Sequence, residues 1–209
     1  MVHEGPDPDF PPASAASHWH AVCSILAVLS MPTEFTRKLF TYADCLRMAE
    51  SGVLSPAEKV ELIHGEILLM SPPGARHGAA VDRTAEAMSE LVKGQAIVRS
   101  QGGVVLDAYA APLPDIALLA FRSDYYVTSN PGVADILLIV EVADSSFDYD
   151  ISVKLQLYAI AGISEYWVAD LKNNRLLVHN RNGRRTNPSS SCTEETPSRL
   201  RVFLSAESL

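Results

Sequence analysis

The stretch DILLIVEVADSSFDYDISVKLQLY, residues 135–158, contains the two elements on which the fold prediction depends. Residues 136–140 are an unbroken apolar run rich in β-branched side chains, short enough to be a fully buried strand. Glu141 follows at once, so the pattern places a carboxylate where this strand leaves the core. A helix is predicted over 149–161, and it carries Lys154. Because an acid at the end of a buried strand is costly unless a cation or hydrogen-bond donors meet it, Glu141 requires such a partner.

A second acid stands at the head of another short apolar run, LPDIALLA, residues 113–120. This run is also predicted to be a strand, and Asp115 lies at its start. If the two strands are neighbours, Asp115 and Glu141 can bind a divalent metal, and Lys154 can hold a phosphate beside it. Taken alone, Asp115 also fits a turn aspartate that follows Pro114, and Glu141 also fits a buried salt bridge to Lys154 that needs no metal.

A β-hairpin is predicted further towards the N-terminus. Two apolar runs, residues 60–63 and 66–70, flank a His-Gly pair at 64–65, which is typical of a two-residue turn. Such a turn places Glu61 and Glu66 on one face together with two apolar side chains. That face is either a place where carboxylates gather or the solvent-exposed side of the hairpin.

The other predicted elements follow from hydrophobic periodicity and from capping residues. His77 falls in the first turn of an amphipathic helix, where it either contacts substrate or has a structural role. The expected helices cover 41–50 and 77–93, and the expected strands cover 96–99, 104–106, 165–170 and 176–179.

The composition predicts a globular chain of one ordinary domain. Its 209 residues are 47% hydrophobic and 20% charged, which excludes a disordered chain. The net charge of −8 argues against a protein covered with basic groups for nucleic acid, although it allows a local basic groove or acids around a metal. The three cysteines, Cys23, Cys45 and Cys192, lack the spacing of metal ligands and fit a reducing, cytoplasmic environment.

Neither end of the sequence predicts a membrane segment. No apolar run approaches the roughly 18 residues that a membrane span requires. Residues 21–29 could form a signal-peptide core, but the segment before them is acidic and rich in proline, with no Lys or Arg, so secretion is not expected. His18 and His20 are too few for a metal site of three or four ligands.

The chain contains five stretches in a characteristic order: KVELIHGEILLMSPPGARH (59–77), LPDIALL (113–119), LLIVEVADSS (137–146), DISVKLQLYAIAGISEYWVAD (150–170) and the hairpin after them. Together they resemble the Uma2 family of restriction-endonuclease-like proteins within the PD-(D/E)xK nuclease superfamily. The resemblance covers about residues 36–180 and implies an α/β fold, in which a mixed sheet carries both acids and helices pack on it. The expected organisation is a disordered or unshared extension over 1–32, a nuclease domain over 33–180 and an irregular tail over 181–209.

The resemblance also implies roles for individual residues. Asp115 and Glu141 correspond to the family's acidic pair and would bind Mg²⁺ or Mn²⁺ with help from the Val142 carbonyl. Lys154 would contact the scissile phosphate or orient the attacking water. Glu61 would steer that water or help with a second metal.

The sequence departs from the family pattern at two positions. The superfamily's usual lysine, two residues after the glutamate, is replaced by Ala143, and the turn residue that is usually Asp in relatives is His64. The resemblance predicts a metal-dependent endonuclease that hydrolyses DNA phosphodiester bonds, in a chain without a membrane partner. A homodimer is a further option, because nucleases that cut both strands are commonly dimeric. An inactive nuclease-fold module that binds nucleic acid or protein, and a metal-dependent hydrolase of a small phosphodiester, remain as alternatives.

Overall fold

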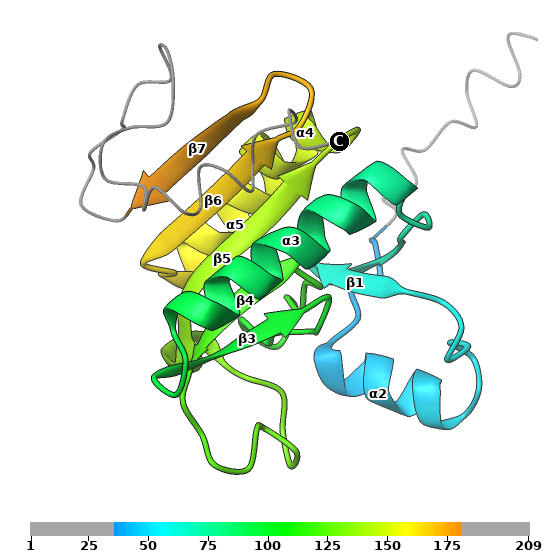
Figure 1. The fold of residues 1–209 in the computed structure, drawn as a ribbon. Coiled ribbons are helices and arrows are strands. Elements are labelled where there is room, and N and C mark those ends of the chain that lie inside the picture. The colour runs from blue at the N-terminus through cyan, green and yellow to red at the C-terminus, as the bar shows by residue number, and fades with distance from the viewer. Residues whose placement is uncertain (1–35, 181–209) are drawn as a thin grey trace, which may run out of the picture. The chain divides into compact units, whose positions relative to one another are not determined.

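A five-stranded mixed sheet is the frame of the structure, a computed structural model that describes residues 36–180 (Figure 1). The predicted extension over 1–32 and tail over 181–209 fall outside the described residues. The strand order is β3-β4-β5-β6-β7, with β5 and β6 parallel and the other neighbours antiparallel. This confirms the predicted α/β fold with a mixed sheet. The strands are β3 (Ala96–Ser100), β4 (Ile116–Ala120), β5 (Ile136–Ala143), β6 (Glu165–Asp170) and β7 (Arg175–Asn180).

Helices cover both faces of the central strand β5. Helix α3 (Ala75–Leu91) lies across one face of the sheet, and α5 (Leu155–Ala161) lies behind the other (Figure 1). Because both faces are buried, the strand is a continuous apolar run instead of an alternating one. Side chains alternate along a strand, so Glu141 points to the α5 side. The residues packed on the α3 side are Leu138, Val140 and Val142, and those on the α5 side are Ile139 and Ala143.

The predicted hairpin is formed by β1 (Val60–Ile63) and β2 (Glu66–Leu69). Its antiparallel register sets Glu61 opposite Leu68, which confirms the two-residue turn and the shared face. Glu61 is wholly buried, with 0% of its surface exposed. The solvent-exposed interpretation of this face is therefore wrong at Glu61.

The predicted helix over 149–161 is present but is not a uniform α-helix. It consists of α4 (Phe147–Tyr149), a π-helical turn, η3 (Asp150–Lys154), and then α5. In the π-helical turn the Leu155 N–H donates to the carbonyl of Asp150, five residues earlier. Such wider turns occur frequently at functional sites. Both Asp150 and Lys154 are buried here.

Between the hairpin and the central strand, one predicted strand is absent and one short helical turn is present. The predicted strand over 104–106 is wrong, because its hydrogen bonds go to several different segments instead of to one neighbouring strand. Val104 donates to Pro112, Val105 to Pro131 and Leu106 to Ala110. A 3₁₀ turn, η2 (Val133–Asp135), leads into β5.

Helix α2 (Tyr42–Glu50) begins as predicted. Thr41 is its N-cap, and the Thr41 hydroxyl and the Asp44 carboxylate form a capping box. No helix among residues 36–180 is long and apolar enough to cross a membrane.

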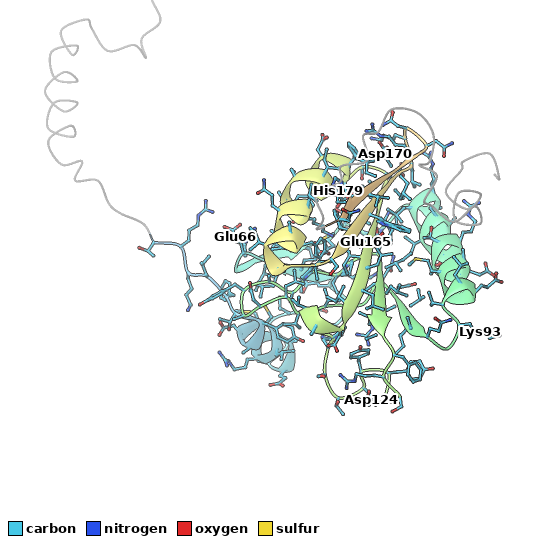
Figure 2. The ribbon with its side chains drawn as sticks, turned by 90° about the vertical axis from the view of Figure 1, so that its left-hand side faces the viewer. Glu66, Lys93, Asp124, Glu165, Asp170 and His179 are labelled. Atoms are coloured by element: carbon cyan, nitrogen blue, oxygen red, sulfur yellow. The ribbon has the colours of Figure 1, made fainter. Side chains whose placement is uncertain are left out.

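The turn between β6 and β7 and the loop between β4 and β5 lie at opposite ends of the sheet. Figure 2 shows Asp170 at one end and Asp124, in the loop between β4 and β5, at the other. Asp170 closes the β6–β7 turn by accepting hydrogen bonds from the Asn173 amide and from Arg175 Nε at 2.8 Å. Burial works against the charged form of Asp170, but these bonds prevail and lower the pKa of its carboxyl. The end of the sheet with Asp170 is also the end where β5 finishes.

We expect Gly65→Ala to destabilise the protein more than Gly52→Ala does. Both glycines have left-handed φ values, +78° and +76°, so alanine at either position costs roughly 1–2 kcal/mol in backbone strain. At Gly65 a Cβ would also lie 2.8 Å from Leu39 Cβ, whereas at Gly52 nothing lies within 4 Å. This overlap should add about 1–3 kcal/mol to the loss in free energy of unfolding. Urea unfolding of the two variants measures the difference, and equal losses would contradict the prediction.

Candidate active site

Asp115 and Glu141 lie opposite each other near the end of β5. Strands β4 and β5 pair with Ile116 opposite Val140, so one further antiparallel step sets Asp115 opposite Glu141. The Asp115 N–H donates to Glu141 Oε2 at 3.3 Å, and the Val142 N–H donates to Asp115 Oδ2 at 2.8 Å. The sheet therefore brings together the two acids that the sequence placed on separate strands.

Lys154 places a buried ammonium group between two carboxylates. Its Nζ lies 2.9 Å from Glu61 Oε1 and 3.0 Å from Glu141 Oε1, and no side chain of the three is more than 4% exposed. The π-helical turn carries both Lys154 and Asp150, and both residues are buried. The salt bridge that was one alternative for Glu141 is present.

Further donors complete the surroundings of the two glutamates. The Leu113 N–H donates to Glu61 Oε1 at 2.8 Å, while Glu61 Oε2 is buried without a hydrogen-bond partner among the described residues. The Tyr158 hydroxyl donates to Glu141 Oε1 at 3.1 Å. Tyr158 is wholly buried and packs against Tyr166, with ring centroids 5.0 Å apart.

Burial and charge act on these groups in opposite directions. Burial raises the pKa of Glu141 above its ordinary value, against the opposing effect of the Lys154 ammonium. Burial alone would lower the pKa of Lys154, but the carboxylates of Glu141 and Glu61 outweigh it and raise that pKa, so Lys154 keeps its charge. Burial also raises the pKa of Asp150 to about 6, although the Ser146 hydroxyl, 2.6 Å from its Oδ2, opposes this. The cluster thus holds more acids than bases.

His77 reaches the same cluster from the first turn of α3. Its Nε2 lies 3.0 Å from Asp115 Oδ1, and the ring is partly buried. The hydrogen bond to Asp115 raises the pKa of His77, and burial opposes this effect. The Val142 backbone and the Glu141 carboxylate also raise this pKa, to a smaller extent. The sequence showed where His77 falls in the helix but not that it contacts Asp115.

A pocket of about 520 Å³ opens over this cluster. Three of the four predicted catalytic residues line it, and the fourth, Glu61, is not among the lining residues. The sequence did not single out Tyr149 or Ser146, because neither belongs to a recognisable pattern. The acidic, basic and aromatic groups that line the pocket include Asp115, Glu141, Lys154, His77, Asp150 and Tyr149.

The donors at the pocket fit a hard divalent cation. The Ala143 carbonyl accepts from the Leu171 N–H, and since successive carbonyls alternate along a strand, the Val142 carbonyl points the other way, towards Asp115. Two carboxylates and one carbonyl oxygen suit Mg²⁺ or Mn²⁺, which keep several waters as ligands. Within residues 36–180 no group of three or more His, Cys, Asp or Glu side chains is placed so that it could hold a metal ion. A cation here would rest on the two carboxylates and one carbonyl oxygen and would keep waters as its other ligands.

We expect Lys154→Met to lower the free energy of unfolding by about 3–5 kcal/mol, because it leaves two buried carboxylates without their cation. Lys172→Met is the matched control, since Lys172 is exposed in the β6–β7 turn and should change stability little. Adding Glu141→Gln to Lys154→Met should recover part of the lost free energy of unfolding, because it removes one of the two buried carboxylates that no longer have a cation. Urea unfolding measures all three variants, and a Lys154→Met protein as stable as Lys172→Met would contradict the buried ion pair.

Glu141→Gln should gain stability relative to the wild type as the pH rises. Native Glu141 keeps its proton to higher pH than the unfolded chain does, so the native state loses stability relative to the unfolded state above pH 4.5, the ordinary pKa. Glutamine does not titrate and removes this loss. Urea unfolding at pH 5 and pH 8 in EDTA measures it, with Glu86→Gln as the control for loss of an exposed carboxylate on α3. A constant difference between the wild type and Glu141→Gln would contradict the raised pKa.

Comparisons with known proteins agree with this fold. A family model described as "Uma2: Putative restriction endonuclease" matches residues 42–207. A crystal structure described as "a putative nuclease belonging to DUF820 from Anabaena variabilis ATCC 29413" is similar, with a TM-score of 0.58 at 14% sequence identity. The alignment covers 79% of this chain and 99% of that chain. A comparison with curated proteins gives no match. The resemblance deduced from the sequence is confirmed, and this chain belongs to the Uma2 family of restriction-endonuclease-like nucleases.

Proposed function

We propose that this chain is a divalent-metal-dependent endonuclease that hydrolyses DNA phosphodiester bonds. One observation carries the proposal. Two carboxylates, Asp115 and Glu141, face each other in a pocket where the Lys154 ammonium lies 3.0 Å from Glu141. Membership of a family described as restriction endonucleases supports the same reaction.

Phosphodiester hydrolysis requires a nucleophilic water and positive charge near the phosphoryl oxygens and the leaving group. When bound, Mg²⁺ or Mn²⁺ supplies that charge and activates the water. In this chain Asp115, Glu141 and the Val142 carbonyl would hold the cation. Two carboxylates are enough, because Mg²⁺ is usually bound through one or two carboxylates and keeps several waters.

Lys154 would offset negative charge on the phosphate. Its ammonium is held by Glu61 and Glu141, so it need not be ordered when substrate binds, and preorganised charge stabilises a transition state most effectively. Glu61 does not line the pocket, so we assign it first to positioning Lys154.

Basic side chains near the pocket favour the approach of a polyanion such as DNA, although the chain as a whole is acidic. Lys59 is exposed at the pocket and donates to Gln101 at 2.8 Å. Arg76, with 44% of its side chain exposed, lies 3.4 Å from Asp144, another lining residue. Such groups supply phosphate contacts next to the cluster, while the overall charge of −8 limits binding elsewhere on the surface.

Plasmid and single-stranded DNA should be cleaved in the presence of Mg²⁺ or Mn²⁺, and Asp115→Asn should slow cleavage by at least about a hundredfold, as loss of a charge-stabilising group does. Asp82→Asn is the control, because Asp82 is an exposed acid of α3 away from the pocket. Bis(p-nitrophenyl) phosphate, tested in parallel, separates a DNA nuclease from a hydrolase of small diesters. No cleavage of DNA with either ion, in a folded protein that binds the ion, would favour the inactive binding module instead.

A further inference from the structure

Asp150 is a buried acid of the pocket to which the proposed function gives no role. It lies in the π-helical turn that also carries Lys154, and it lines the same pocket as Asp115 and Glu141. Only 2% of its surface is exposed. Burying a carboxylate costs free energy, and titratable groups whose pKa is shifted by burial are concentrated at functional sites. The position of Asp150 therefore points to a chemical role.

Hydrogen bonds hold Asp150 in one position. Its N–H donates to the Ser146 carbonyl at 3.0 Å. Its own carbonyl accepts from the Leu155 N–H and from the Tyr166 hydroxyl, the latter at 3.0 Å. The side-chain oxygen Oδ2 accepts from the Ser146 hydroxyl at 2.6 Å. The backbone and one carboxylate oxygen are thus fixed before any substrate binds.

The second carboxylate oxygen of Asp150, Oδ1, faces the pocket. Among residues 36–180 nothing donates a hydrogen bond to Oδ1, and yet it is not closed off from solvent as Oε2 of Glu61 is. Because Asp150 lines the pocket, the solvent that reaches Oδ1 is water in the pocket. A fixed carboxylate with one free oxygen can accept a proton from such a water.

We infer that Asp150 is the general base that deprotonates the attacking water, and that Ser146 orients it for this step. The inference rests on the proposed function, because it uses the same pocket and the same phosphodiester. Oδ1 takes one proton of the water while the water oxygen bonds to phosphorus. The bond between phosphorus and the leaving sugar oxygen breaks with its electron pair, and that oxygen takes a proton from solvent. Asp150 then returns its own proton to solvent.

The surroundings of Asp150 bring its pKa into the range that a base requires. Burial has the largest effect and raises the pKa of Asp150 to about 6. The Ser146 hydroxyl and the Lys154 ammonium oppose this rise in pKa, whereas the carboxylates of Asp115 and Glu61 add to it. The other titratable side chains that line the pocket are Lys59, His77, Glu141, Asp144 and Tyr149. A base whose pKa lies near the working pH is both largely deprotonated and strong enough to take a proton.

Asp150 has two alternative roles, as a ligand of the cation or as a structural counter-charge to Lys154. Loss of a ligand weakens binding of the cation. Loss of a structural counter-charge changes stability and leaves the rate of cleavage by the folded protein nearly unchanged. Only a base makes the pH dependence of the rate follow the hydrogen bond from Ser146.

The first test compares Asp150→Asn with Asp148→Asn in the full 209-residue chain. Asp148 is an exposed acid of the same helical segment and does not line the pocket, so it is the matched control. Asp150→Asn should slow plasmid cleavage with Mn²⁺ by at least about a hundredfold, as loss of a general base does. By calorimetry, Mn²⁺ affinity should change by less than about tenfold, because loss of a ligand's own hydrogen-bond partner already costs that much. Asp148→Asn should change neither quantity.

The second test uses Ser146→Ala, which keeps Asp150 and removes only the hydroxyl bonded to it. Cleavage should slow as the pH falls through the pKa of Asp150, because a protonated carboxyl cannot act as a base. Since the Ser146 hydroxyl lowers that pKa, its loss should move the acidic limb of the rate profile to higher pH. Ser152→Ala is the control, an exposed serine of the same turn outside the pocket, and it should leave the limb in place.

A titration of the metal-free protein gives a measurement that does not depend on cleavage. Carbon-13 NMR follows the Asp150 carboxyl, whose signal is identified by its absence in Asp150→Asn. Its titration should move to higher pH in Ser146→Ala and stay in place in Ser152→Ala, as the rate profile does.

The outcomes separate the inference from the proposed function. If Asp150→Asn cleaves DNA as fast as Asp148→Asn, or binds Mn²⁺ tenfold or more weakly, the inference is overturned and the proposed function stands. An acidic limb that does not move in Ser146→Ala would overturn the inference too. If the wild type cleaves no DNA, both fail. Should Asp150→Asn not fold, the rate profile of Ser146→Ala still decides.

Discussion

The buried ammonium of Lys154 is the interaction on which the rest of the structure depends. It contacts Glu61 from the N-terminal hairpin and Glu141 from the central strand, and it comes itself from the π-helical turn before α5. Removing any one of three such charges from water would cost several kcal/mol if it had no partner. The three segments must therefore meet at one point, and this requirement fixes where the hairpin and the helix lie against the sheet.

The geometry of the sheet then adds the remaining groups. Because β5 is buried on both faces, its alternation sends Glu141 to the α5 side, where Lys154 lies. The antiparallel step past the last pair of β4 and β5 sets Asp115 beside it. Helix α3, on the other face, supplies His77 at the same end of the sheet. The cluster therefore lies at one end of the sheet, where β4, β5 and the helices on both faces each contribute a side chain.

The buried cluster of acids around Lys154 stabilises the fold poorly, but it is suited to chemistry. Glu61, Asp115, Glu141 and Asp150 share a single lysine, and burial raises the pKa of two of them, which is unfavourable for the native state at neutral pH. A chain selected only for stability would replace such a group with apolar side chains. Strained electrostatics of this kind, next to an open pocket, are typical of functional sites.

By itself the sequence determined the kind and order of most elements, since apolar periodicity, capping residues and turn glycines act within one or two turns of the chain. It also determined the family and, through it, the acidic pair. Only the tertiary structure decided the partners of the site residues. Lys154 comes from a π-helical turn and lies between Glu61 and Glu141, although Glu61 is far from it in the sequence. Likewise, His77 meets Asp115 only because α3 crosses the sheet. The physical reason is that the free energy of burying a charge depends on groups distant in sequence, which no local pattern records.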